Sequence, residues 1–262
     1  MMILFYTPFL YTIQTRLKSK AHVLSWLVIY IIPVFFCFSF FNEGDSVTTI
    51  ILKGVLGILL IYNLYEVGYI YNDAETIKKE KKPTYRLSPD SLDYYEKNKY
   101  SIYSVRFVAA LIISIIIFIF FKNVGFLFAA WSIIILYAIY NNIRNIFNLP
   151  IHFLLVTVRF CSLLILYSPI GFGCAFILMI FIFPVINTLE RCSEKRFDLA
   201  LFQNMTLCNK KDGRYKYYLA LLLVSFVLLI IDTTQATVVF TMYCIYFFIY
   251  RYLLSRIIKD EF

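Results

Sequence analysis

The chain has 262 residues, of which 61% are hydrophobic and 16% are charged, and its formal net charge is +9. A soluble globular domain carries roughly 25% charged residues and no long apolar runs, so this composition excludes a soluble protein. It predicts an all-α, polytopic membrane bundle of about eight transmembrane helices. Since excess Lys and Arg are typical of cytoplasmic loops, we expect a membrane as partner and no nucleic acid.

The first 21 residues are predicted to form an interfacial segment ahead of the spanning helices. Their basic residues, Arg16, Lys18 and Lys20, follow the apolar part, whereas a signal peptide begins with its positive charges. Pro8 also interrupts the apolar part. A segment that lies at the membrane surface therefore fits better than a cleaved signal.

Eight apolar stretches approach the length of roughly 20 residues that a helix needs to cross a bilayer core. They are residues 22–41, 47–71, 102–121, 123–140, 150–168, 170–189, 215–231 and 235–255. We expect them to form one transmembrane domain over residues 1–262.

The distribution of basic residues predicts that both termini are cytoplasmic. With that orientation the external connectors hold Lys122 as their one basic residue, beside the acids Glu43, Asp45 and Asp232. Cytoplasmic loops of membrane proteins are the ones enriched in Lys and Arg. We expect a multi-pass protein of a bacterial inner membrane, with its active site on the cytoplasmic side.

Two cytoplasmic connectors, residues 72–101 and 190–214, are long, and we expect both to contribute to the active site. They follow the second and the sixth predicted spans, so four spans separate them. This spacing suggests two halves, each of which presents one polar helix end to a shared site.

Polar side chains gather at the end of the second span. They are Asn63, Glu66, Asn72, Asp73, Glu75 and Glu80. Glu66 and Asp73 are seven residues apart, which places them nearly on one face of a helix. A carboxylate inside the membrane usually faces a cavity or a partner. The structural alternative is that Glu66 pairs with a buried cation, and Arg106 and Arg159 are both available.

A second acidic group follows the sixth span. Glu190, Glu194 and Asp198 recur every four residues, so a helix that continued from this span would carry them as one stripe, with Lys195 and Arg196 beside it. A solvated helix end with ion pairs is the alternative. Like charges at this spacing repel each other unless a divalent ion lies between them.

These residue types together indicate a site for Mg²⁺ and a diphosphate. Carboxylate and amide oxygens are ligands that suit Mg²⁺, which usually also binds substrate phosphates. Lys and Arg neutralise phosphate oxygens. Because apolar spans surround the site, a second substrate can be a lipid that arrives from the bilayer. Such a transfer depends on positioning and on stabilisation of the leaving pyrophosphate.

Residues 71–87, with the sequence YNDAETIKKEKKPTYRL, resemble the first motif of the UbiA superfamily of intramembrane prenyltransferases, NDxxDxxxD followed by a Pro-Thr/Arg segment. The matching residues are Asn72, Asp73, Glu80, Pro83, Thr84 and Arg86. Thr76 stands where the family usually has its middle Asp, and Glu75 is the candidate substitute. The family usually has nine spans, so nine is the alternative to the eight counted here.

The family's second motif follows its sixth span, as LERCSEKRFDL does here. Glu190 with Glu194, or Glu194 with Asp198, resembles the DxxxD pattern of aromatic prenyltransferases. Residues 195–199 are more similar to the KRxxEL-type segment of the decaprenyl-phosphate phosphoribosyltransferase branch. The short loop with Tyr140, Asn141 and Arg144 also resembles that branch.

The resemblance implies a UbiA-like fold, Mg²⁺ and a transferase activity. In the branch just named, phosphoribosyl pyrophosphate is the donor and a polyprenyl phosphate is the acceptor. The implied catalytic residues are Asp73, Glu80, Glu75 and Asn72. Among them, Asp73, Glu80 and Glu75 would also bind the metal, joined by Glu194 and Asp198. The expected substrate-binding residues are Lys195, Arg196, Arg86, Arg144, Glu66, Glu190 and Asn63.

Two other functions stay open at this point. One is prenyl transfer from a polyprenyl diphosphate to a small aromatic acceptor, within the same superfamily. The other is a non-enzymatic transporter or scaffold, because charges inside the membrane, such as Glu66 and Arg159, also mark transport pathways. No pair of helices broken by Gly or Pro is evident at corresponding positions, which argues against a transporter.

Overall fold

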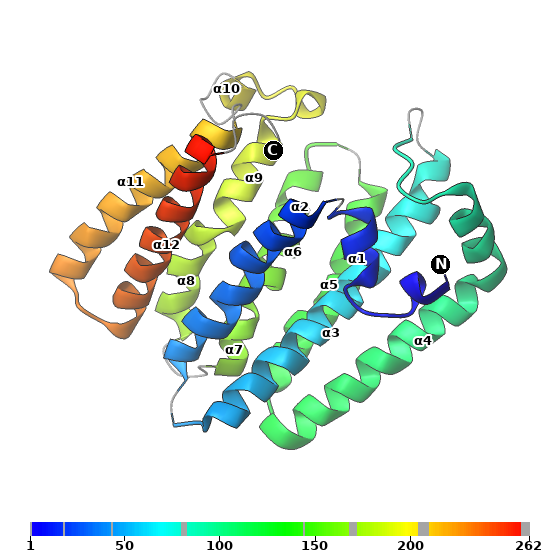
Figure 1. The fold of residues 1–262 in the computed structure, drawn as a ribbon, viewed down its shortest axis with the longest axis horizontal. Coiled ribbons are helices and arrows are strands. Elements are labelled where there is room, and N and C mark those ends of the chain that lie inside the picture. The colour runs from blue at the N-terminus through cyan, green and yellow to red at the C-terminus, as the bar shows by residue number, and fades with distance from the viewer. Residues whose placement is uncertain are drawn as a thin grey trace. The chain divides into compact units, whose positions relative to one another are not determined.

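The computed structural model describes residues 2–17, 19–42, 44–79, 83–143, 145–167, 172–203 and 210–257. Within these ranges the regular structure is helical, without a strand (Figure 1). The prediction of an all-α protein is therefore confirmed for the part of the chain that is described.

Seven helical segments are long and apolar enough to cross a membrane. They are Lys20–Phe41, Val47–Lys79, Pro89–Phe121, Val124–Asn142, Asn148–Tyr167, Asp212–Ile231 and Gln235–Arg256. A further pair, Gly173–Ile182 and Pro184–Cys192, is bent by 40° and counts as an eighth span if it is taken as one. These helices identify a multi-pass membrane protein, and they agree with the prediction of about eight spans among the described residues.

Contacts divide the chain into two compact units. Unit 1 comprises Met1–Ile32 and Asp45–Ile143, and unit 2 comprises Pro33–Gly44 and Arg144–Phe262. The first predicted loop belongs to unit 1 and the second to unit 2. A single domain and a site shared by both loops therefore stay predictions.

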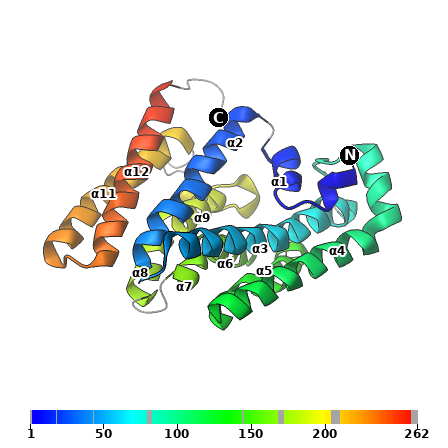
Figure 2. The same ribbon diagram turned by 60° about the horizontal axis from the view of Figure 1, so that its bottom comes forward.

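Unit 1 is built around helix α3, against which α4 and α5 pack (Figure 2). Its elements are η1 (Met2–Phe5), α1 (Leu10–Thr15), α2 (Lys20–Trp26), the π-helical η2 (Leu27–Ile31), α3 (Val47–Ala74), η5 (Thr76–Lys79), α4 (Pro89–Phe121) and α5 (Val124–Asn142). Residues 89–101, expected in a loop, form the first turns of α4.

Side-chain caps explain where the long helices of unit 1 begin. The hydroxyl of Ser46 accepts a hydrogen bond from the backbone N–H of Thr49 at the start of α3. Ser88 caps α4 in the same way, with Pro89 at the first helical position. Such caps satisfy N–H groups that the helix itself leaves without acceptors.

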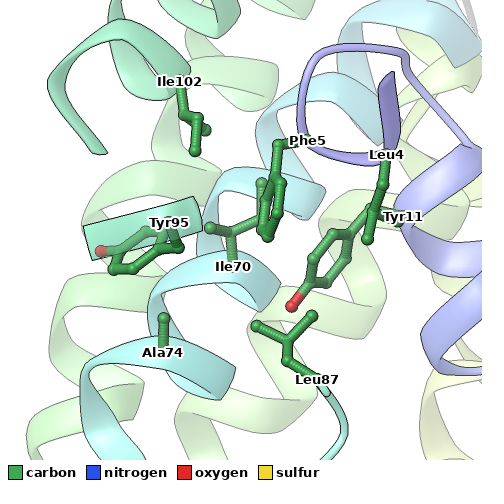
Figure 3. Packing of buried hydrophobic residues seen from close by; sticks show 8 residues of the cluster. All are labelled: Leu4, Phe5, Tyr11, Ile70, Ala74, Leu87, Tyr95 and Ile102. Carbon is green, nitrogen blue, oxygen red and sulfur yellow. The ribbon is translucent and has the colours of Figure 1, made fainter. Parts of the chain in front are cut away.

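The N-terminal segment, residues 2–17, contributes to the core of unit 1. Phe5 and Tyr11 are fully buried, and Figure 3 shows both beside Ile70 of α3. Tyr95 of α4 belongs to the same cluster. The segment therefore packs its apolar side chains on the protein, a packing that the prediction of an interfacial segment did not include.

Unit 2 consists of a broken helix and the helices that pack on it. Its elements are η3 (Pro33–Cys37), η4 (Phe38–Phe41), α6 (Asn148–Cys161), α7 (Leu163–Tyr167), α8 (Phe172–Ile182), α9 (Pro184–Cys192), η6 (Lys195–Phe197), α10 (Ala200–Gln203), α11 (Lys210–Ile231) and α12 (Gln235–Ile257). Helices α11 and α12 form a hairpin, α8 packs on α12, and α6 packs on α9.

The break between α8 and α9 has a local cause. Pro184 cannot donate a backbone hydrogen bond, and its ring clashes with the preceding turn of a helix. Tyr218 of α11 donates a hydrogen bond to the carbonyl of Ile182 at 2.7 Å, and Tyr217 donates one to the carbonyl of Phe181 at 2.5 Å. Inside a membrane, a broken helix needs such replacement partners for its backbone.

Candidate functional site

Asp73, near the end of α3, is the centre of the best-defined polar cluster. Its side chain is fully buried. Its Oδ2 accepts a hydrogen bond from the Tyr11 hydroxyl at 3.0 Å, and its Oδ1 accepts from Nη2 of Arg16 at 2.9 Å. Arg86 Nη1 and Asn72 Nδ2 both lie 3.2 Å from the same Oδ1. Three separate stretches of the chain therefore meet at one carboxylate.

The two arginines of this cluster are bound to the buried Asp73, and their side chains are partly exposed to solvent. The side chain of Arg16 is 18% exposed and that of Arg86 is 34% exposed. Arg16 also lies over the ring of Tyr69, 4.5 Å from its centroid. Because two guanidinium groups exceed one carboxylate, the cluster has a positive charge. The partly exposed side chains of its two arginines suit an anion such as phosphate.

Burial and charge fix the protonation of the groups around Asp73. Burial raises the pKa of the Tyr11 hydroxyl, and the charge and hydrogen bond of Asp73 raise it further, so the phenol stays protonated and donates. Burial by itself would lower the pKa of Arg16, but the hydrogen bond and charge of Asp73 outweigh it, and the pKa is raised. Both groups therefore keep their donor roles at neutral pH.

A second polar cluster lies seven residues earlier on α3. Glu66 and Arg106 form an ion pair with an Oε2–Nη1 distance of 2.9 Å, and both side chains are 0% exposed. Arg106 Nη1 also donates to Oδ1 of Asn63 at 3.0 Å, and Asn63 Nδ2 donates to the carbonyl of Arg106 at 2.7 Å. Of the two cations that the sequence offered to Glu66, Arg106 is its partner. Asn63 and Glu66, both expected to bind substrate, are committed to this buried network.

Glu75 belongs to a separate network from that of Asp73. It accepts hydrogen bonds from Lys78 and from the Tyr95 hydroxyl, each at 2.9 Å. Lys78 in turn pairs with Glu96 of α4 at 2.5 Å. Thr76 is buried, and its hydroxyl makes no hydrogen bond within the described part of the chain.

The described residues show no cluster of acidic, histidine or cysteine side chains at the place expected for Mg²⁺. No group of three or more His, Cys, Asp or Glu side chains gathers among them. Both oxygens of Asp73 are bound by arginine and tyrosine donors, so a cation there would have to displace a guanidinium group. Glu80, the remaining predicted ligand of the first motif, lies outside the described residues. The expectation of Mg²⁺ stays a prediction.

In unit 2 the expected acidic stripe does not form. Helix α9 ends at Cys192, the backbone at Glu194 is extended, and Asp198 has a positive φ of 51°. Glu190 is therefore helical whereas the other two acids are not, and the prediction of one continuous helix is wrong.

Arginines, rather than one another, are the partners of these acids. Arg214 of α11 binds both carboxylate oxygens of Glu190. Glu194 lies 2.8 Å from Nε of Arg196 and 3.4 Å from Nη1 of Arg191.

Two of the three basic residues of unit 2 that were predicted to bind substrate are described, and both are exposed to solvent. Lys195 and Arg196 are both exposed, and Arg196 lies 4.5 Å from the centroid of the Phe197 ring. Arg144 lies outside the described residues.

A cavity of about 350 Å³ lies between α3, α4 and α5. Rings of Tyr71, Tyr103, Phe107 and Tyr137 line it. Asn141, which also lines it, is 6% exposed, and its Oδ1 has no hydrogen-bond partner in the described part of the chain. No acid or base with a full charge lies in this wall, so the cavity suits a neutral, apolar group.

Sequence reasoning missed Tyr11 and Arg16 as members of the site. Arg16 entered it as a charge that sets the orientation of the chain, and Tyr11 did not enter it. The available signal for Arg16 is that it is the first charged residue of the chain, at the end of an apolar segment, and that a buried carboxylate such as Asp73 needs a cation. Tyr11 carries no comparable signal.

No protein-family model matches the chain, and no curated protein and no solved structure does so either.

Proposed function

We propose that the chain is a membrane-embedded transferase that binds a phosphorylated donor through Arg16 and Arg86 and passes the donated group to a lipid acceptor at its cytoplasmic face. Our preferred reaction is phosphoribosyl transfer from phosphoribosyl pyrophosphate to a polyprenyl phosphate. The observation that carries the proposal is the pair of partly exposed arginines held by one fully buried carboxylate, Asp73.

The chemistry of guanidinium groups supports a phosphate ligand. Each arginine has five N–H donors in a fixed plane, and Asp73 occupies those that face inward. Because Asp73 already holds both side chains, they should lose little further rotamer freedom when a ligand binds. Oxygen atoms of a diphosphate are acceptors that fit such donors, with a charge opposite to that of the cluster.

In this proposal Asp73 is a positioning residue for the arginines. Its own oxygens point at donors of the protein, so a leaving pyrophosphate would be stabilised by the N–H groups of Arg16 and Arg86. Mg²⁺ remains part of the proposal as the resemblance implies it, with Glu80 and Glu75 as further predicted ligands. The described residues do not support a metal site without Glu80.

The second predicted segment supplies the other proposed contacts. The exposed Lys195 and Arg196, with Arg144, are proposed to bind phosphates of the donor or of the lipid.

Prenyl transfer to a small aromatic acceptor is the alternative reaction. The aromatic cavity beside Tyr71 favours it, because that residue directly precedes Asn72 and the wall suits a neutral ring. A transporter is less well supported. Glu66 and Arg106 are both 0% exposed and bound to each other, as a structural pair would be.

Labelled substrates separate these functions. Membranes that contain the protein are incubated with labelled phosphoribosyl pyrophosphate and a polyprenyl phosphate, or with labelled polyprenyl diphosphate and a hydroxylated benzoate. We expect lipid-linked label from the first mixture and its loss in Arg86→Ala. Lys97→Ala, which removes an exposed base of α4 in the same unit, is the matched control.

Label transferred from the second mixture alone would replace the preferred reaction by the alternative. Absence of transfer from both, in membranes where the folded protein is present, would overturn the transferase. Repeating the active mixture with a chelator tests Mg²⁺ separately.

A further inference from the structure

We infer that the N-terminal segment, residues 2–17, is a docked part of the site, and that Glu66, Asn63 and Arg106 are positioning residues that hold it in register so that Arg16 reaches Asp73. The identity of the ligand rests on the proposed function. The docking itself rests on contacts within unit 1.

The buried ion pair of Glu66 and Arg106 forms hydrogen bonds with the backbone of the N-terminal segment, and these bonds are called the grip below. Glu66 accepts hydrogen bonds from the backbone N–H of Phe9 at 3.1 Å and of Thr12 at 2.7 Å. Arg106 donates from Nε to the carbonyl of Phe5 at 2.8 Å and from Nη2 to the carbonyl of Thr7 at 3.1 Å. Four backbone groups within eight residues are thus bound by one ion pair.

Two carboxylates of α3 hold the two ends of α1. Glu66 binds the start of α1 at Phe9, and Asp73 binds its end at Arg16. Glu66 and Asp73 are seven residues apart, and so are Phe9 and Arg16. Seven residues of a helix span about 10.5 Å. Helix α1 therefore lies along α3 in a fixed register, and the spacing of the two acids sets that register.

The chain between Phe9 and Arg16 is stiffened by its own hydrogen bonds. The N–H of Arg16 donates to the carbonyl of Thr12 at 2.8 Å, and the Thr15 hydroxyl donates to the carbonyl of Tyr11 at 2.7 Å. Phe9, the residue before α1, has a φ of 70°, a value that non-glycine residues seldom adopt. Holding Phe9 and Thr12 therefore fixes where Arg16 arrives.

The dependence runs in both directions. A buried ion pair is stable only when further hydrogen bonds satisfy its remaining donors and acceptors, and the segment supplies several of them. Undocking would leave Glu66 with fewer donors and Arg106 with fewer acceptors, although both side chains are fully buried in the folded chain. The segment and the pair are therefore expected to be ordered together.

The test compares Glu66→Gln with Glu96→Gln in the full chain, reconstituted in lipid nanodiscs. Glu96 is a 45%-exposed acid of the same unit and serves as the matched control. We measure amide hydrogen exchange of residues 9–16 and, separately, the Kd for phosphoribosyl pyrophosphate. In Glu66→Gln we expect exchange of that segment to become about tenfold faster or more, with α5 unchanged. The Kd should rise by about tenfold, because Arg16 is no longer held at Asp73.

Unchanged exchange in folded Glu66→Gln would overturn the docking. Faster exchange with an unchanged Kd would overturn the positioning role. If the wild-type chain does not bind this donor, the proposed ligand fails while the exchange experiment still decides the docking.

A second variant guards against failure of Glu66→Gln to fold. Thr12→Pro removes one N–H from the grip of Glu66 and leaves α3 and α4 untouched. Thr12 lies in the first turn of α1, where proline is tolerated. The same faster exchange at residues 9–16 is expected, and its absence would count against the proposal.

Discussion

Glu66 and Arg106 form a fully buried ion pair, with 2.9 Å between Oε2 and Nη1 and no exposed side-chain surface on either residue. The pair joins α3 to α4 and ties both to the N-terminal segment through backbone hydrogen bonds. From sequence alone, a charged residue such as Glu66 inside a membrane span is predicted to be functional. In the structure its contacts are with other residues of the protein, which is typical of a structural ion pair.

Removal of one member of this pair is expected to be costly. Arg106→Met leaves Glu66 buried without its counter-charge, and breaking a buried pair in this way costs about 3–5 kcal/mol. The free energy of unfolding in detergent micelles measures this loss. The matched control is Lys99→Met, a half-buried base on the same helix. A loss no larger than that of the control would contradict the role given to the pair.

Replacing both Glu66 and Arg106 should lower the free energy of unfolding by less than the sum of the losses in the single variants Glu66→Gln and Arg106→Gln. Glu66→Gln with Arg106→Gln removes both charges and leaves no buried charge without a partner. Residues that contact each other show coupling of about 0.5–3 kcal/mol in such a cycle. Additive losses would show that the two residues act independently.

Alkaline unfolding should depend on Tyr11. The pKa of this phenol is raised in the folded chain, so above the ordinary tyrosine pKa of about 10 the unfolded chain loses a proton that the folded chain keeps. The unfolded state then binds fewer protons, and stability falls as the pH rises above that value. Stability curves measured between pH 9 and 11 should be steeper for the wild-type chain than for Tyr11→Phe. Equal slopes would show that burial and Asp73 do not raise the pKa of Tyr11 in the folded chain.

Gly68 allows α3 to approach α5 closely. A Cβ at this position would lie 2.2 Å from the nearest atom of the Tyr137 ring, a contact that forces the ring to move. Gly68→Ala should therefore destabilise the fold by about 1–3 kcal/mol. Gly173→Ala is the matched control, because no atom lies within 4 Å of its added Cβ. Similar melting temperatures for the two variants would contradict the close approach.

The hydrogen bond at the helix break can be tested in unit 2. Tyr218→Phe removes the donor to the carbonyl of Ile182 and leaves that carbonyl buried without it, which costs about 1–3 kcal/mol. Tyr252→Phe, on an exposed face of α12, is the control. A thermal unfolding shift no larger than the control's would mean that the break does not depend on this bond.

Hydropathy predicted the bounds of helices that are apolar throughout, but it missed the polar turns with which a helix can begin. The expected stretch 47–71 compares with α3 at Val47–Ala74, and 235–255 compares with α12 at Gln235–Ile257. Helix α4 begins at Pro89 rather than at residue 102, because its first turns are polar and hydropathy does not register them. A capping Ser88 followed by Pro89 was the available local signal.

The site was predictable where it is local in sequence. Asn72, Asp73 and Arg86 were selected from one motif, and they meet in the structure. Arg16 and the grip of Glu66 on the N-terminal backbone depend on contacts between residues more than fifty positions apart. Pairings over that distance leave no mark in residue spacing, so one sequence could not supply them.

The equal spacing of the two contact points on α3 and on the N-terminal segment makes the length of that segment a constraint in its own right. The side chain of Gln14 is exposed and Glu66 binds backbone groups, so a substitution at Gln14 would leave the hydrogen bonds to Glu66 in place. One inserted residue would turn the rest of α1 by about 100° and advance it by about 1.5 Å. Arg16 would then face away from Asp73. Selection on this stretch should accordingly act on the number of residues between Phe9 and Arg16 as well as on the buried side chains among them, such as Tyr11.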